Sequence, residues 1–209
     1  MNSIENIYIC LAAPLLLALL CLGREARRGM IFMLAGMTAS LLSAYVSSFV
    51  SSVLNADLLA ASYEIAPAVE ETMKFLPLLF YLMVFEPEKK RAISGALRIA
   101  VSFATFENVC FLTSYGTNDL LLLVIRGFST GAMHVVCGML VAIGLFFLWD
   151  RLWFRIVGSF ALLCLVITFH AIFNILVNQS GLVFWIGSVV PLTVVIIWLI
   201  FFKQKIGLS

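Results

Sequence analysis

The sequence predicts an all-α protein, a polytopic transmembrane helical bundle that forms a single domain over residues 1–209. Three observations support this prediction: an apolar composition, repeated apolar runs of membrane-spanning length, and basic residues confined to alternate loops. The chain is 63% hydrophobic and only 11% charged, whereas a soluble domain carries roughly 25% charged residues. Such a chain cannot cover a water-facing surface, so its solvent is lipid. Its net charge of only +2 gives no indication of a nucleic-acid partner.

The apolar runs predict seven spans, because a helix needs about 20 mostly apolar residues to cross a bilayer. The runs cover residues 7–22, 30–53, 65–85, 94–114, 120–149, 154–177 and 183–202. The fifth run is longer than a straight span requires. We therefore expect this helix to tilt, to kink near Gly127 or Gly131, or to project beyond the bilayer.

The loops alternate in charge. Three of them, 54–64, 115–119 and 178–182, contain no Lys or Arg. The basic residues lie in the other loops, at the adjoining ends of the spans or after the last span: Arg24, Arg27, Arg28, Lys89, Lys90, Arg91, Arg98, Arg151, Arg155, Lys203 and Lys205. Positive loops stay on the cytoplasmic side, so the N-terminus is predicted outside and the C-terminus inside. The first span begins with Glu5 and no basic residue, so we do not expect a cleaved signal peptide.

Apart from Arg98 and Arg155, which lie near the basic ends of their spans, seven acidic, basic or histidine residues lie inside the predicted spans: Glu70, Glu71, Lys74, Glu107, Arg126, His134 and His170. A charge at the bilayer centre costs ~2.5–3.5 kcal/mol on insertion scales, so such residues face the bundle interior and usually serve a function. Arg126 lies near a span end and is interpreted as interfacial. The others are candidates for a buried polar site.

The predicted depths of these residues agree. At about 1.5 Å per residue, Glu70, Glu71, Glu107 and His170 lie roughly 8–11 Å below the outer surface. His134 lies deeper unless the fifth span projects outward.

Spacing along the helices adds further relationships. Glu70 and Lys74 are at i and i+4 in the order that favours an ion pair. His170 and Asn174 share one face of a helix. Arg126, Thr130, His134 and Gly138 form a row in which Gly138 would let a neighbouring helix approach closely.

These residues also carry a family resemblance. The segment Glu70-Glu71-Thr-Met-Lys74 resembles the EExxK motif of the PrsW family of intramembrane proteases, and Phe106-Glu107-Asn108 resembles its FEN motif. The segment from Arg126 to His134, with Gly138 after it, resembles the third motif, and His170-Ala-Ile-Phe-Asn174 the last. The four motifs occur in the family's order within a core of about residues 65–178. One departure is Phe111, where the family usually has an aromatic hydroxyl; Tyr115 would substitute for it.

The resemblance implies a multi-pass protein of the cell membrane, in bacteria the cytoplasmic membrane. It implies an intramembrane endopeptidase whose substrate is a membrane-anchored protein, such as a single-span anti-sigma factor. The CAAX prenyl-endoproteases and their Abi relatives share the double Glu and the two His, but more typically carry Arg where Lys74 stands. They act on the cytosolic side, which disagrees with the predicted outer site.

The residues suggest two chemistries for peptide hydrolysis. In both, Glu70 or Glu71 is the base that deprotonates water, and Lys74 pairs with the other glutamate. In the first, His134, His170 and Glu107 bind zinc and leave one position open for water. In the second no metal binds, and the histidines donate hydrogen bonds to the water and the oxyanion.

Asn174 would be a second oxyanion donor or would orient His170, while Asn108 and Arg126 support the site. A proton- or ion-coupled transporter is an alternative, since buried acids, lysine and histidines also form proton relays. Transporters usually show internal repeats and helices broken at mid-membrane. No repeat is visible between the halves of this chain, although Pro77 allows one local break.

Overall fold

The computed structural model describes residues 4–85, 88–116, 119–149 and 151–201, and within these ranges the regular structure is entirely helical. The α-helices are α1 (Ile4–Cys21), α2 (Arg24–Leu54), α3 (Leu58–Ala60), α4 (Ala66–Phe85), α5 (Lys89–Tyr115), α6 (Leu120–Leu148), α7 (Ser159–Val177) and α8 (Leu182–Phe201). The π-helical turn η1 (Ala61–Ile65) leads directly into α4, and η2 (Phe154–Gly158) leads directly into α7. The predicted all-α class is confirmed.

Six helices in the described part of the chain are long and apolar enough to cross a membrane: α1, α2, α5, α6, η2 with α7, and α8. The seventh expected span, α4, has 20 residues but carries Glu70, Glu71 and Lys74. At 1.5 Å per residue its length is about 30 Å, which matches the hydrocarbon core of a bilayer. The chain is a multi-pass membrane protein in which α4 relies on its neighbours to bury its charges.

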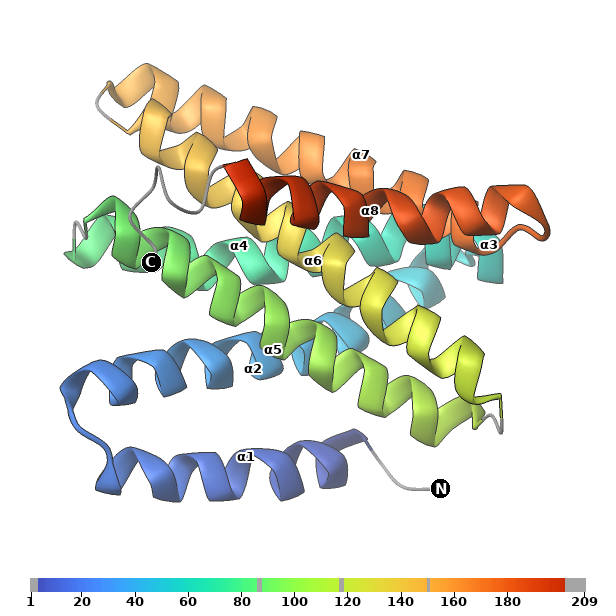
Figure 1. Cartoon of the computed structure of the whole chain (residues 1–209), viewed down its shortest axis with the longest axis horizontal. Coiled ribbons are helices and arrows are strands. Elements are labelled where there is room, and N and C mark those ends of the chain that lie inside the picture. Colours follow the sequence, from blue (N-terminus) through green and yellow to red (C-terminus); the bar gives the residue numbers. More distant parts are fainter. Residues whose placement is uncertain (1–3, 86–87, 117–118, 150, 202–209) are drawn as a thin grey trace.

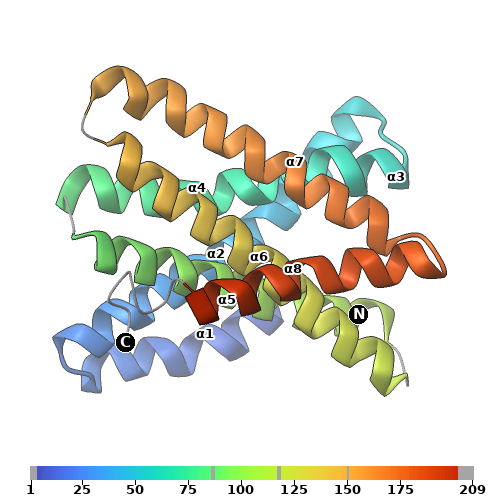
Figure 2. The same cartoon turned by 45° about the horizontal axis from the view of Figure 1, so that its top comes forward.

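The bundle is built around α5 and α6, and its apolar core lies along them (Figures 1 and 2). Ile93 of α5 and Met133 and Leu145 of α6 are completely buried there. α1 lies at one edge against α2, and α7 and α8 lie on the other side of α6. α6 is one uninterrupted helix of 29 residues that crosses its neighbours obliquely, so of the three alternatives for its extra length a tilt agrees with the structure better than a break near Gly127 or Gly131.

Small residues let the helices approach closely, as is common where both partners are surrounded by lipid. A Cβ added at Gly36 of α2 would overlap the backbone of Ile99 on α5. A Cβ at Gly138 of α6 would lie 3.0 Å from that of Ala100 on α5, which confirms the close approach predicted at Gly138. These glycines therefore set the spacing of the helices that carry the polar residues.

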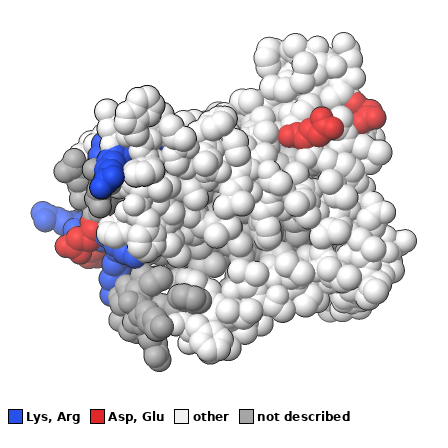
Figure 3. All heavy atoms as spheres, turned by 90° about the horizontal axis from the view of Figure 1, so that it is seen from above, with Lys and Arg blue, Asp and Glu red and all other residues white. Residues whose placement is uncertain are grey.

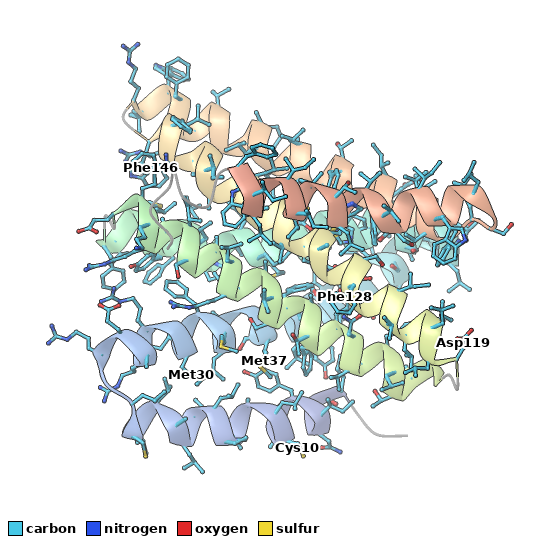
Figure 4. All side chains as sticks on the ribbon, in the orientation of Figure 1. Cys10, Met30, Met37, Asp119, Phe128 and Phe146 are labelled. Carbon is cyan, nitrogen blue, oxygen red and sulfur yellow. The ribbon has the colours of Figure 1, made fainter. Side chains whose placement is uncertain are left out.

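Basic residues gather at one end of the bundle. Figure 3 shows the Lys and Arg side chains of one face at a single end of the molecule, whereas acidic side chains occur at both ends. Lys89 lies over the rings of Phe146 and Phe147, at 4.6 and 4.5 Å from their centroids. Figure 4 places Phe146 and Asp119 at opposite ends of α6. Which end faces the cytoplasm stays a prediction.

Candidate active site

Ionisable side chains from four helices meet in the interior of the bundle. They are Glu70, Glu71 and Lys74 of α4, Glu107 of α5, His134 of α6 and His170 of α7. Glu71, Lys74 and both histidines are buried, whereas the Glu70 and Glu107 side chains are 17% and 28% exposed. The structure thus brings together the residues that we expected at one depth. The partly exposed carboxylates of Glu70 and Glu107 are the parts of the cluster that solvent can reach.

Lys74 binds two partners in the cluster. Its Nζ lies 2.6 Å from Oε1 of Glu71 and 2.6 Å from Nδ1 of His134. We expected an ion pair with Glu70 at i,i+4, but the pair forms with Glu71 at i,i+3. Both spacings bring side chains together on a helix. Lys74 pairs with Glu71 because both side chains point into the buried interior. There, Nδ1 of His134 also accepts a hydrogen bond from the Lys74 ammonium group.

His134 links Lys74 to Glu107. An ammonium group can only donate hydrogen bonds, so Nδ1 of His134 accepts and its Nε2–H donates to Oε2 of Glu107, at 2.7 Å. The other Glu107 oxygen, Oε1, lies 3.4 Å from Nη2 of Arg126. The Arg126 guanidinium in turn lies over the ring of Phe111, at 3.6 Å from its centroid. Arg126 therefore holds Glu107 in place. Tyr115, which the sequence offered as the substitute for a hydroxyl at position 111, has its side chain outside the described part of the chain.

His170 sits between two adjacent glutamates. Its Nδ1 lies 2.7 Å from Oε1 of Glu71, and its Nε2 lies 3.8 Å from Oε2 of Glu70. This Glu70 oxygen is buried and has no hydrogen-bond partner among the described residues. The rings of His134 and His170 are perpendicular, with centroids 5.2 Å apart. An unsatisfied carboxylate oxygen and an imidazole nitrogen thus face each other across a gap.

This gap suits a divalent metal. Glu70, His134 and His170 each offer one ligand atom, and these atoms lie within 4.8 Å of one another. Two imidazoles and one carboxylate are a common catalytic zinc set. The carboxylate on Nδ1 of His170 is the partner that metal-bound histidines usually have. We expected Glu107 in this set, but Glu70 takes its place, and Glu107 hydrogen-bonds to His134 instead.

The amide of Asn174, expected at the oxyanion or at His170, has its partner outside the cluster. Nδ2 of Asn174 donates to the carbonyl oxygen of Ser62 at 3.0 Å, and Asn178 donates to the Tyr63 hydroxyl. Both bonds tie η1 to α7, so the Asn174 amide is directed to η1 and not to His170. The Oδ1 atom of Asn108 is buried without a hydrogen-bond partner in the described ranges.

Phe103 belongs to the site and was not predicted from the sequence. Phe103 is completely buried. Its ring centroid lies 4.9 Å from Nζ of Lys74 and 5.1 Å from the ring centroid of His134. A cation over an aromatic face is stabilised by the ring quadrupole. The available signal was its position one helical turn before Glu107, on the same face of α5.

The comparisons with known proteins identify one family. A family model described as PrsW family intramembrane metalloprotease matches residues 14–202. This match extends beyond the four motifs and includes the C-terminal part of α1, from Pro14 on, and all of α8. The search of curated proteins and the search of solved structures found no match.

Proposed function

Because this chain belongs to the PrsW family of intramembrane proteases, we propose that it cleaves a membrane-anchored protein by metal-assisted hydrolysis at the cluster between α4, α5, α6 and α7. Family membership makes the chain a peptidase with a membrane-embedded protein substrate. One observation carries the mechanistic proposal: the unpartnered Oε2 of Glu70 faces Nε2 of His170 at 3.8 Å.

Glu70, His134 and His170 are the residues that would hold the metal, and His134 would have to give up its hydrogen bond to Lys74 or to Glu107 to bind it. A bound divalent ion supplies Lewis-acid polarisation of the scissile carbonyl and of the attacking water. Glu71 and Lys74 do not reach the reacting atoms in this arrangement. They are positioning residues, because Glu71 fixes the ring of His170 and Lys74 fixes both Glu71 and His134.

Glu107 is the general base in this proposal. The sequence suggested Glu70 or Glu71 for this role, but Glu71 is buried between Lys74 and His170, and Glu70 faces the gap. Glu107 is also hydrogen-bonded, to His134 and Arg126, and differs from Glu71 in its exposure. Glu107 is partly exposed, lies next to His134 and is steadied by Arg126. Its carboxylate takes a proton from the water that attacks the carbonyl carbon. It then delivers this proton to the amide nitrogen as the carbon–nitrogen bond breaks.

The position of the cluster indicates the substrate. Glu70 lies about one turn from the start of α4 and His170 about two turns from the end of α7. Both ends belong to the side of the bundle whose loops lack Lys and Arg. If basic loops are cytoplasmic, cleavage occurs near the outer face of a bacterial cytoplasmic membrane. A single-span protein of the anti-sigma type fits this location better than a lipidated C-terminus in the cytosol.

The test uses purified protein in liposomes with a panel of single-span substrates. We expect the wild type to cleave at least one of them. Glu70→Gln and Glu107→Gln should each lower cleavage by ~10²–10⁴-fold, as expected for loss of a catalytic carboxylate. Bound metal should be lost in Glu70→Gln and kept in Glu107→Gln. Glu64→Gln, an exposed carboxylate nearby on η1, is the matched control.

Two results would change the proposal. An inactive Glu70→Gln protein that keeps a full complement of metal would make Glu70 the base, and an active wild type without metal would remove the metal from the mechanism. Equal cleavage by the wild type and both variants would remove the cluster from catalysis altogether.

A further inference from the structure

A second polar feature lies beside the cluster, in a pocket of about 110 Å³ between α5, α6, α7 and α8. Three aromatic rings and three hydroxyl groups contribute to its lining: Phe111, Phe173, Phe184, Ser129, Thr130 and Ser188. Arg126 lines it as well and connects it to Glu107. The pocket is separate from the cluster, because its lining includes none of the six ionisable residues of the cluster.

The pocket lies one helical turn beyond the cluster on three different helices. Phe111 follows Glu107 by four residues on α5, and Thr130 precedes His134 by four residues on α6. Phe173 follows His170 by three residues on α7. One turn is about 5.4 Å along a helix. A peptide whose scissile bond sits at the cluster would therefore place a neighbouring side chain at this pocket.

Ser188 of α8 gives the pocket a chemical preference. Its side chain is 2% exposed, and its Oγ has no hydrogen-bond partner among the described residues. A buried polar group without a partner is costly, and a ligand that supplies the partner removes that cost. The pocket volume exceeds the roughly 10–15 Å³ that one water needs, so several atoms fit. The aromatic walls suit an apolar stem.

We propose that this pocket receives the substrate side chain next to the scissile bond, and that it prefers an uncharged side chain with an apolar stem and a hydrogen-bonding end. Glutamine has this chemistry, and leucine has a similar size without the hydrogen-bonding end. The inference rests on the proposed function, since it assigns a specificity pocket to the same site. Ser188 acts as the group that distinguishes the two kinds of side chain.

The experiment compares substrates that differ only at one residue flanking the cleaved bond, with Gln, Leu or Ala at that position. We expect the wild type to have a higher kcat/KM for Gln than for Leu. Ser188→Ala should lower this ratio about tenfold, the effect of one hydrogen bond in a buried site. Ser188→Leu fills the pocket and should reduce cleavage of the Gln and Leu substrates more than that of the Ala substrate.

Ser47→Ala is the matched control, because Ser47 of α2 also has a buried Oγ without a hydrogen-bond partner in the described part of the chain but does not line the pocket. It should leave the ratio unchanged. An unchanged ratio in Ser188→Ala, or an equal loss for all three substrates in Ser188→Leu, would overturn the pocket assignment while cleavage persists. Absence of cleavage by the wild type would overturn the proposed function itself. Ser188→Ala removes a single oxygen atom, so we expect this variant to fold and its cleavage to be measurable.

Discussion

Nδ1 of His170 donates a hydrogen bond of 2.7 Å to Glu71 across the interface between α7 and α4. This bond fixes the orientation of the imidazole and leaves Nε2 directed toward Glu70. The same Glu71 oxygen accepts from Lys74. The adjacent glutamates therefore have different environments: Glu71 hydrogen-bonds to His170, and Oε2 of Glu70 has no hydrogen-bond partner among the described residues.

Replacing Glu71 should weaken metal binding without removing a ligand. In Glu71→Gln the amide oxygen can still accept from His170, but the negative charge behind the imidazole is lost. Loss of such a partner typically costs 10–100-fold in metal affinity, so we expect a shift of about that size in a metal titration of the purified protein. Glu64→Gln should bind metal like the wild type. Equal affinity in Glu71→Gln would show that the Glu71–His170 bond does not support a metal.

Lys74→Met should act first on stability. It leaves Glu71 buried without its cationic partner and removes the hydrogen bond to His134. Breaking one side of a buried ion pair costs about 3–5 kcal/mol, whereas replacing both partners by apolar residues is often neutral. The double variant Lys74→Met, Glu71→Met should therefore regain much of the lost stability. Denaturant unfolding in micelles measures both, with exposed Lys90→Met as control. A double variant no more stable than the single one would contradict the pairing.

Gly36 and Gly127 should respond in opposite ways to alanine. At Gly36 an added Cβ would overlap the Ile99 backbone, so Gly36→Ala must push α2 away from α5. Overpacking of this kind costs roughly 1–3 kcal/mol. Gly127 has open space around it, and Gly127→Ala should be neutral or stabilising by up to about 1 kcal/mol through helix propensity. The same unfolding measurement checks both, and equal effects would contradict the close packing at Gly36.

Cysteine labelling tests the predicted orientation. Single cysteines at Gln179 and Lys90, in a protein whose five native cysteines are replaced, sample the two ends of the bundle. We expect an impermeant reagent added to intact cells to label position 179 and to reach position 90 only after permeabilisation. The opposite pattern would place the cluster near the cytoplasm and favour a substrate of the prenylated type.

The sequence predicted the helices well because a lipid solvent demands long apolar runs, and it predicted the members of the cluster because charges inside such runs are rare. It did not predict the partners. Neighbouring residues on a helix point about 100° apart, so the choice between Glu70 and Glu71 as partner of Lys74 depends on the rotation of α4 in the bundle. Ser188 gave no signal at all, since one serine in an apolar helix is ordinary.

The charges of α4 have a consequence for how the protein is made. α4 is synthesised before α6 and α7, and Lys74 and Glu71 gain their hydrogen bonds to His134 and His170 only when these histidines have emerged from the ribosome. Until then, Glu71 and Lys74 can neutralise only each other, and the segment is a poor candidate for release into lipid on its own. We expect a nascent chain truncated before His134 to leave α4 accessible to a water-soluble label and the full chain to protect it. Membrane integration of this helix and assembly of the polar cluster are then a single event, so a chain that fails to build the cluster also fails to complete its topology.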